Sequence, residues 1–211
     1  MNSIVKISAI AVLILVAVGF SGCCCCYGAD GFTSKYQKSA DAIQFPAQIT
    51  ADGKTLTLTK SEYLPSADAC KEASIKALAD EGQGGKISAG DIGTALSFAG
   101  GTSGKTFEYS DASGTKRVGG FVGKGDSPGK LSAAFIAGKQ LLSGSGDVKY
   151  SDSFKAGDEA YVYTTDEFRE PASIGLCRYS NMFIYACSYD SSASAEDAVA
   201  SAIAAIDAAN K

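Results

Sequence analysis

The chain has 211 residues, with 19 lysine and arginine against 23 aspartate and glutamate residues, and it contains no histidine. Without histidine it cannot form a Ser-His-Asp triad, a Cys-His catalytic pair or a histidine-based zinc site. The formal net charge is −4, and no cluster of basic residues provides a nucleic-acid-binding surface. Most hydrolase mechanisms are therefore excluded, and we expect no cofactor, no metal and no nucleic acid.

The first 22 residues are typical of a signal peptide. A short polar start that contains Lys6 precedes residues 7–20, which are almost wholly apolar, and small residues follow. The apolar run is shorter than the roughly 20 residues that a membrane-spanning helix needs. Removing residues 1–22 leaves 18 basic and 23 acidic side chains, and the remaining length suits one domain.

A run of four cysteines begins directly after this leader. The stretch Phe20-Ser21-Gly22-Cys23 resembles a lipobox, in which an apolar residue and two small residues precede the cysteine. The resemblance implies that Cys23 carries a thioether-linked diacylglycerol, which anchors the protein to the outer face of the cell membrane. An uncleaved anchor and ordinary secretion are the alternatives, and all three export the chain. Cys24, Cys25 and Cys26 are candidates for further acylation, such as palmitoylation, or for cross-linking to neighbours.

Three further cysteines lie outside this run, at Cys70, Cys177 and Cys187. Because their number is odd, one of them is free or pairs with a cysteine at 24–26. A two-residue turn at Ser180-Asn181 sets Cys187 opposite Ile174, so Cys177 points to the other face of the sheet. Cys177 and Cys187 are poor partners in this register. We predict that Cys70 forms a disulfide with one of them.

The chain after the leader divides into two parts. Residues 23–45 are expected to be the lipidated cysteine run and a tether, because residues 27–42 are polar and aperiodic. Residues 46–211 are expected to form a single exported globular domain. The tether would hold this domain away from the membrane.

The first elements of the domain are a hairpin and a helix. Asp52-Gly53 is a strong signal for a two-residue turn, and this register sets Ile49 opposite Leu56. Residues 66–80 have the pattern of a helix. A shorter helix is predicted after Ser88, where apolar residues recur at i, i+3, i+4 and i+7.

The second half is predicted to contain a hairpin (residues 107–122), a helix that begins at Ser127-Pro128, three strands within residues 159–189, and a last helix capped by Ser194. Ser127 and Ser194 occupy equivalent places after strands, which suggests a divergent strand-strand-helix duplication. The predicted architecture is α+β, an antiparallel sheet with helices packed on one face.

Short stretches from Ile87 onward resemble exported sensor and lipoprotein domains. They are Ser88-Ala89-Gly90-Asp91-Ile92-Gly93, Phe107-Glu108-Tyr109-Ser110-Asp111, Arg117-Val118-Gly119-Gly120-Phe121-Val122, Gly157-Asp158-Glu159-Ala160-Tyr161, Arg178-Tyr179-Ser180-Asn181-Met182-Phe183-Ile184 and Ser194-Ala195-Glu196-Asp197. The family includes the domains outside actinobacterial receptor kinases (PknH-like). In such domains Gly-Asn usually precedes the Met-Phe-Ile strand, whereas Ser180 stands here in place of the glycine. The resemblance implies a non-enzymatic extracytoplasmic domain that binds or senses something.

Residues 99–106 (Ala-Gly-Gly-Thr-Ser-Gly-Lys-Thr) fit a loose spelling of the phosphate-binding loop. Such a loop needs a strand before it and a helix after it, so that N–H groups at the start of the helix converge on the phosphates. Here helix-like residues precede the segment and strand-like residues follow it. We therefore expect no nucleotide binding.

Aspartate follows tyrosine near the ends of three expected strands, at Asp111, Asp152 and Asp190. Carboxylates are the ligands that calcium takes, but aspartate is also a preferred turn residue. Because the chain has no compact D-x-D-x-D-G loop, turns are the better interpretation. The ten tyrosines could line a ligand groove, although tyrosines that alternate along strands first indicate a half-buried sheet surface.

Arg178 is the most informative single charge. The predicted hairpin register places it with Phe183, where it is a candidate for an ion pair with an acidic side chain or for an anion site. Three classes of function remain. A surface-anchored domain that binds or senses a small molecule leads, followed by a structural or partner-binding envelope protein, and then by an enzyme limited to Asp/Glu or Ser/Lys chemistry.

Overall fold

The computed structural model describes residues 36–80, 100–144, 149–165 and 171–211. The elements in chain order are η2 (Ala40–Ala42), β1 (Gln48–Ala51), β2 (Lys54–Leu64), α2 (Ala67–Asp80), β3 (Gly101–Ser110), β4 (Lys116–Gly125), α4 (Pro128–Gly144), β5 (Lys149–Ser151), β6 (Glu159–Thr165), β7 (Ala172–Tyr179), β8 (Met182–Ser188) and α5 (Ser192–Asn210). The short helix predicted after Ser88 and the cysteines at 23–26 lie outside the described residues.

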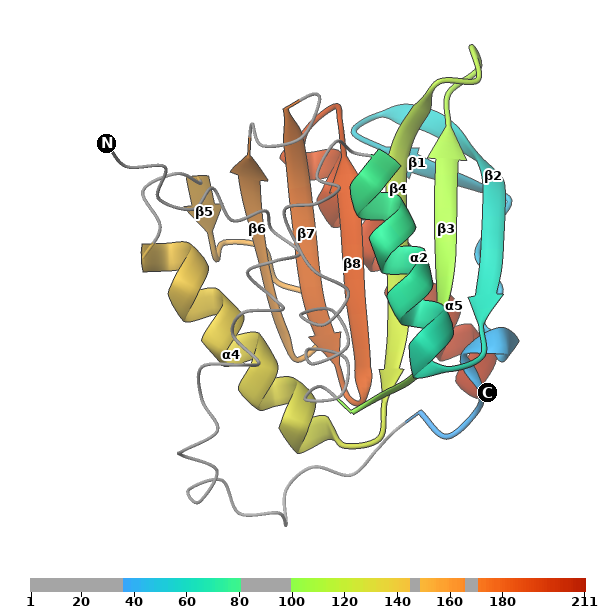
Figure 1. The fold of residues 1–211 in the computed structure, drawn as a ribbon. Helices are drawn as coiled ribbons and strands as arrows, with labels where there is room; N and C mark the ends of the chain where they lie inside the picture. Colours follow the sequence, from blue (N-terminus) through green and yellow to red (C-terminus); the bar gives the residue numbers. More distant parts are fainter. Residues whose placement is uncertain (1–35, 81–99, 145–148, 166–170) are drawn as a thin grey trace.

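The strands form one antiparallel sheet in the order β1-β2-β3-β4-β8-β7-β6-β5 (Figure 1). Each half of the sheet is a run of four consecutive strands, and the two runs meet where β4 pairs with β8. This arrangement confirms the predicted α+β class and the antiparallel sheet.

The helices cover both faces of the sheet, which corrects the prediction that they share one face. Gly175 of β7 faces α5, since a Cβ atom there would lie 3.1 Å from Val199 Cγ2. The next residue, Leu176, points to the other face and packs with Phe135 of α4. Figure 1 shows α2 and α4 in front of the sheet and α5 behind it. Because α4 and α5 lie on opposite faces, the suggested strand-strand-helix duplication does not extend to the helices.

The two predicted hairpin turns form as expected. Asp52 (φ 48°) and Gly53 (φ 73°) both have positive φ, as a type I′ turn requires. Ile49 lies opposite Leu56, which confirms the predicted register. In the β7–β8 hairpin, Ile174 lies opposite Cys187, also as predicted.

Serine side chains begin the helices, and one of the predicted caps is wrong. Ser66 accepts a hydrogen bond from the N–H of Ala69 (3.2 Å) at the start of α2. The last helix is capped by Ser191 and not by Ser194, because Ser191 is extended (φ −158°) and its Oγ accepts the N–H of Ser194 at 3.1 Å. Ser194 lies inside the first turn and is fully buried.

Residues 36–45 belong to the domain, which corrects their assignment to the tether. Tyr36, Ala40, Ile43 and Phe45 are buried in the same core as Phe107 and the inner face of α5. The Phe45 and Phe107 rings lie 4.8 Å apart. Burial of side chains as large as Ile43 and Phe45 contributes about 1.5–3 kcal/mol each. Most of this segment has no regular secondary structure, so its apolar residues show no periodicity in the sequence. Its burial depends on the core residues that the sheet places next to it.

The segment that resembles a phosphate-binding loop is part of a strand. From Gly101 onward it forms β3, which pairs with β2 and β4. No helix follows Lys105, and its ammonium group donates hydrogen bonds to the carbonyl oxygens of Asp41 (3.1 Å) and Ile43 (2.6 Å). The side chain therefore serves the packing of residues 36–45.

Candidate polar site

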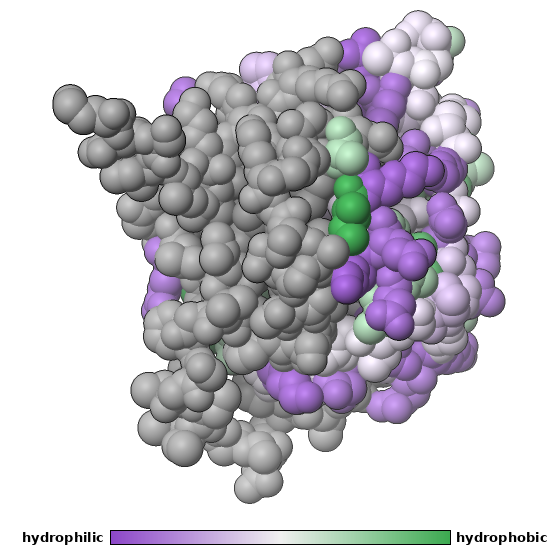
Figure 2. Space-filling view, in the orientation of Figure 1, coloured by the Kyte–Doolittle hydropathy of each residue, from purple (hydrophilic) through white to green (hydrophobic). Residues whose placement is uncertain are grey.

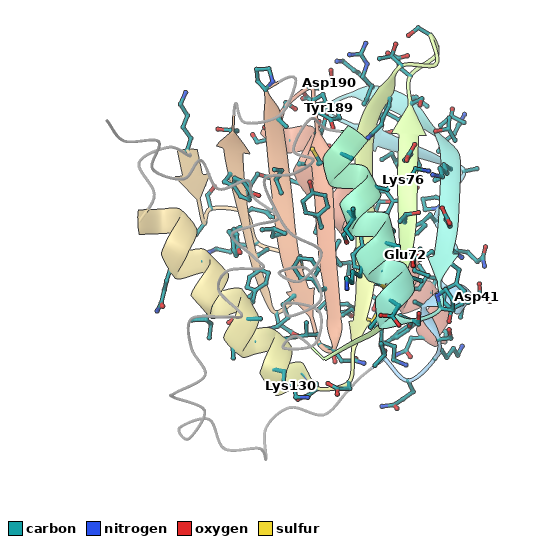
Figure 3. All side chains as sticks on the ribbon, viewed as in Figure 1. Asp41, Glu72, Lys76, Lys130, Tyr189 and Asp190 are labelled. Atoms are coloured by element: carbon teal, nitrogen blue, oxygen red, sulfur yellow. The ribbon has the colours of Figure 1, made fainter. Side chains whose placement is uncertain are left out.

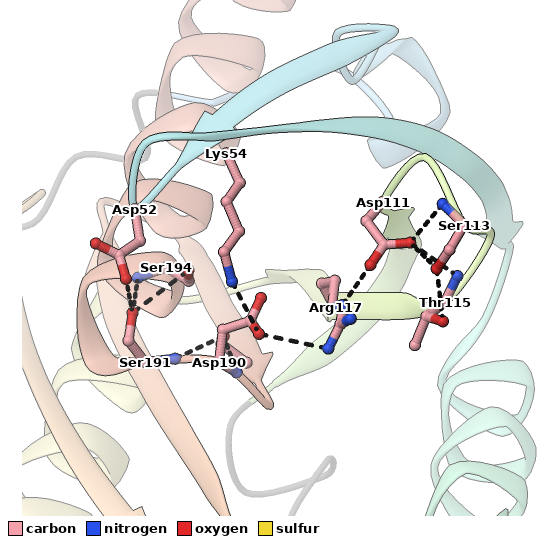
Figure 4. Close-up of polar contacts among 10 residues, drawn as sticks. Asp52, Lys54, Asp111, Ser113, Thr115, Arg117, Asp190, Ser191 and Ser194 are labelled. Atoms are coloured by element: carbon pink, nitrogen blue, oxygen red, sulfur yellow. Dashed lines mark hydrogen bonds and ion pairs between the residues drawn. The ribbon is translucent and has the colours of Figure 1, made fainter.

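A network of charged and hydroxyl side chains joins three connections at one end of the sheet (Figure 4). We call it the polar site. It includes the β1–β2 turn, the β3–β4 turn and the junction between β8 and α5, and its members are Asp52, Lys54, Asp111, Arg117, Asp190 and Ser191. Because the strands are antiparallel, these three connections all lie at the same end of the strands.

Asp190 lies at the centre of the polar site. Its Oδ1 atom is 3.3 Å from Lys54 Nζ and 3.5 Å from Arg117 Nη1. Its Oδ2 atom is shielded from solvent and has no hydrogen-bond partner among the described residues. The Asp190 side chain is 12% exposed, whereas those of Lys54 and Arg117 are 55% and 34% exposed. Two accessible cationic groups thus converge on one shielded carboxylate.

Asp111 fixes the other side of Arg117. Its Oδ1 atom accepts hydrogen bonds from the N–H and hydroxyl groups of Ser113 and from the N–H of Thr115, and Arg117 Nε donates to Oδ2 at 2.7 Å. The Ser113 hydroxyl, followed by the Arg117 guanidinium, holds the pKa of Asp111 well below its usual range. Because hydrogen bonds and a cation favour the charged form of a carboxyl group, this side chain stays ionised.

The third part of the polar site ties the β1–β2 turn to α5. Ser191 Oγ donates to Asp52 Oδ2 at 2.9 Å, while the N–H of Asp52 donates to Asp197 Oδ2, also at 2.9 Å. Asp52 therefore connects the hairpin turn with the N-cap residue and the second turn of α5. The contacts fix the positions of the charged groups relative to the sheet.

The aspartates that follow tyrosine do not gather as a calcium site would require. Asp111 and Asp190 both form ion pairs with Arg117, so a cationic group lies between them. Asp152 forms an ion pair with Lys139 at 3.5 Å. Within the described ranges no group of three or more potential metal ligands occurs. The sequence carries no local signal for the polar site, because its members come from three connections far apart in the chain.

We expect the Asp111→Asn variant to have a lower thermal midpoint at neutral pH, because it loses the charge that Arg117 and Ser113 stabilise. A carboxyl whose pKa is depressed in the folded state stabilises the protein above its unfolded pKa of about 3.9, and this contribution is lost as the pH falls. The stability difference between the two proteins should therefore begin to shrink below about pH 4 and continue to shrink as the pH falls further. Thermal unfolding by circular dichroism between pH 2 and about 8 measures the difference, and a constant difference over this range would contradict the assignment.

Arg178 lies at the opposite end of the sheet in a second network. Its side chain is 7% exposed, with Nη1 3.1 Å from Asp158 Oδ2 and Nε 3.0 Å from Glu159 Oε2. Asp158 Oδ2 also accepts the N–H of Ser180 at 2.6 Å. Arg178 lies opposite Phe183 in the register, as predicted. The network braces the β7–β8 turn, where Ser180 has φ 58°.

The predicted disulfide of Cys70 is absent, since Cys70, Cys177 and Cys187 are all buried thiols. Cys177 packs on the α5 face and Cys187 on the opposite face. Cys70 belongs to α2, which packs on β2 and β3. Two strand spacings, about 10 Å, separate β3 from β8 and its Cys187. Disulfides need Cα atoms within about 7 Å, so neither pairing is available to Cys70.

We expect Cys70 and Cys177 to resist alkylation in the folded protein. Burial raises the pKa of Cys70 to about 11 and that of Cys177 to about 12, and the thiolate is the reactive form. In a protein in which residues 23–26 are serine, Cys70 and Cys177 should gain no mass with iodoacetamide at pH 8, and both should react fully in guanidinium chloride. An Ala112→Cys variant, exposed in the β3–β4 turn, is the positive control. Rapid modification of Cys177 in the native protein would contradict this expectation.

Several tyrosines gather on the α4 side of β6, β7 and β8. Tyr161 and Tyr163 are buried there with Cys187, and Tyr185 and Tyr189 pack against the same cluster. Burial of its hydroxyl group raises the pKa of Tyr185 well above the usual value, and Cys187 and Tyr163 raise it further. Here the tyrosines fill a core, as expected for residues that alternate along strands.

The part of the chain described by the structure contains no helix with the length and apolar character needed to cross a membrane. No protein-family model matches the sequence, and no curated protein matches it either. A crystal structure of the extracellular domain of PknH from Mycobacterium tuberculosis is similar at a TM-score of 0.39 and 10% sequence identity. The match covers 86% of this chain and 97% of that domain, and it is a weak structural resemblance.

Proposed function

We propose that the protein is a lipoprotein held on the outer face of the cell membrane through Cys23. The proposal rests on the signal-peptide pattern of residues 1–22 and on the small residues before Cys23. Two acyl chains on one residue provide durable anchoring, whereas one chain binds only marginally. The domain that follows begins at Tyr36 or earlier, so a short tether is enough to connect it.

We further propose that the domain binds or senses a small charged solute through the polar site. The observation that carries this proposal is the convergence of Lys54 and Arg117 on Asp190 where three connections meet. Binding residues are commonly placed on connections that a rigid scaffold positions. Arg117 is held by carboxylates on two sides, so its guanidinium group is oriented before a ligand arrives, which reduces the entropic cost of binding.

Recognition suits this site better than catalysis. A general acid near neutral pH needs a pKa close to the operating pH, whereas the pKa of Asp111 lies well below its usual range. Asp190 is ion-paired with Lys54 and Arg117. The carboxylates therefore act as fixed charges that orient the cationic groups.

The alternative function is a structural or partner-binding component of the cell envelope, which Cys24, Cys25 and Cys26 would favour by cross-linking. A large exposed apolar patch is one mark of such a role. Ile75 is the large apolar side chain exposed among the described residues, at 37%. Figure 2 accordingly shows a small hydrophobic area next to largely hydrophilic surface. Solute binding therefore remains the leading proposal.

The anchor is tested by metabolic labelling with an alkyne-bearing fatty acid. The wild-type chain should incorporate the label and the Cys23→Ala variant should not. A variant in which Cys24, Cys25 and Cys26 are serine is the matched control, and it should keep the label at Cys23. Unchanged incorporation into Cys23→Ala would mean that the anchor is elsewhere.

Solute binding is tested by thermal-shift measurements with a panel of amino acids, dicarboxylates, phosphate esters and polyamines. A compound that raises the unfolding temperature of the wild type should fail to do so with Arg117→Gln. Lys130→Gln is the control, because Lys130 is 53% exposed and also forms an ion pair, but with Asp126 outside the polar site. Equal responses of the two variants would place binding elsewhere, and no response across the panel would count against a small charged solute.

A further inference from the structure

The residues that join the tether to the domain are held firmly at one end of the sheet. The N–H of Tyr36 donates to Asn181 Oδ1 at 3.1 Å, and Asn181 Nδ2 donates back to the Tyr36 carbonyl oxygen at 2.9 Å. Both residues are 2% exposed. A side chain that pairs with both backbone groups of another residue fixes that residue as a sheet neighbour would. The chain therefore enters the domain beside the β7–β8 turn.

Two lysines hold the residues that follow. Lys124 Nζ donates to the carbonyl oxygens of Gln37 (2.9 Å) and Lys38 (2.6 Å), and it lies 5.6 Å from the centre of the Tyr36 ring. Burial lowers the pKa of Lys124. Lys105 contacts the next carbonyl groups, as described above. We call residues 36–43, held by Lys105, Lys124 and Asn181, the docked segment.

The docked segment and the polar site lie at opposite ends of the same strand. Arg117 is near the start of β4 and Lys124 is seven positions later in it. A strand rises about 3.3 Å per residue, so roughly 23 Å separates the two positions. The neighbouring strand β8 runs antiparallel along the same length, because Lys124 pairs with Met182 and Val118 pairs with Ser188. Figure 3 accordingly shows Asp190 at the upper end of the sheet and Asp41 and Lys130 toward the lower end.

The chain between Cys23 and the docked segment is short. Thirteen positions separate Cys23 from Tyr36. Thirteen residues span at most about 45 Å when fully extended. An anchor at Cys23 therefore keeps the docked segment near the membrane surface, and the length of β4 separates the polar site from it.

From these observations we propose that the docked segment sets the orientation of the domain on the membrane, with the β7–β8 turn toward the lipid and the polar site toward the aqueous phase. This rests on the proposed anchor at Cys23. The orientation implies that the polar site receives its ligand from the aqueous phase and does not read lipid headgroups of its own membrane. Lys54 and Arg117 would otherwise suit anionic headgroups, because both are accessible cations.

Energy transfer from a dye on the domain to labelled lipids tests the orientation. The chain from Cys23, with serine at 24–26, is coupled through Cys23 to a maleimide phospholipid in phosphatidylcholine vesicles that contain a rhodamine lipid as acceptor. An azide-bearing amino acid at position 38 or 112 carries the donor dye, and both positions are exposed. Transfer from position 112 should be lower by at least about twofold, because roughly 23 Å more separates it from the surface.

Equal transfer from the two positions, or stronger transfer from position 112, would overturn the proposed orientation. A Lys124→Met variant, which removes the hydrogen bonds to Gln37 and Lys38, should reduce the difference between the two positions if the docked segment sets the orientation. An undiminished difference would assign the orientation to another contact. Because the lipid is attached chemically, these results do not depend on acylation in cells. A failure of metabolic labelling at Cys23 would overturn the anchor and leave the measured geometry intact.

Discussion

Replacing Arg178 by alanine is expected to lower the free energy of unfolding by about 3 kcal/mol, because it removes the cation between two carboxylates at a buried position. The side chains of Asp158 and Glu159 are 30% and 33% exposed, so water screens part of the repulsion between them. The loss of stability should therefore lie at the low end of the range for breaking a buried ion pair. Urea unfolding followed by circular dichroism measures the change.

Two variants separate the buried position of Arg178 from its charge. Arg178→Lys should cost less than Arg178→Ala, because it keeps the charge but loses the planar fork that reaches Asp158 and Glu159 together. Arg117→Ala removes an arginine with two similar ion pairs whose side chain is 34% exposed, and it should cost no more than about 1 kcal/mol. If Arg178→Ala and Arg117→Ala had equal effects, burial would not be the cause.

Replacing Gly120 by alanine is expected to destabilise the protein by about 3 kcal/mol, since overpacking of a close-packed interior costs typically 1–3 kcal/mol. A Cβ atom there would lie 2.1 Å from Phe107 Cζ and 2.5 Å from the carbonyl oxygen of Tyr185. The ring can turn only by disturbing its contact with Phe45, and the carbonyl group belongs to the neighbouring strand β8. The β4–β8 pairing must therefore widen.

The matched control is Gly129→Ala in the first turn of α4. There the nearest atom to the new Cβ is Ser127 Oγ at 3.8 Å, which is an ordinary contact. Alanine in a helix is more favourable than glycine by about 0.5–1 kcal/mol, so this variant should be slightly stabilised. Thermal and urea unfolding of both variants test the pair of expectations. A neutral Gly120→Ala variant would mean that β4 and β8 can separate at little cost.

Local patterns predicted most of the secondary structure. The Asp52-Gly53 turn was predictable because its backbone needs two positive φ values, which these residue types tolerate. The three strands expected within residues 159–189 are β6, β7 and β8. The last helix was found, but its cap was placed three residues late. Ser191 and Ser194 are equally good caps by residue type, and the choice depends on where the chain leaves β8.

The candidate site could not be predicted in the same way. Lys54, Arg117 and Asp190 have no fixed spacing in the sequence, and the sheet order brings them together by pairing β4 with β8 and by placing the β1–β2 turn beside α5. The expectation for Cys70 failed for a related reason. Whether Cys70 can form a disulfide depends on which strands α2 packs against. The positions of the cysteines in the sequence do not indicate those strands.

The sequence by itself determined the α+β class, the hairpin registers and the absence of histidine chemistry, because each of these depends on residue type or on short-range periodicity. The tertiary structure decided the placement of helices on both faces of the sheet, the inclusion of residues 36–45 in the core, the absence of a disulfide at Cys70, Cys177 and Cys187, and the polar site. These features depend on contacts between segments that are far apart in the chain. Whether a residue is buried in such a contact depends on which segment the fold packs against it.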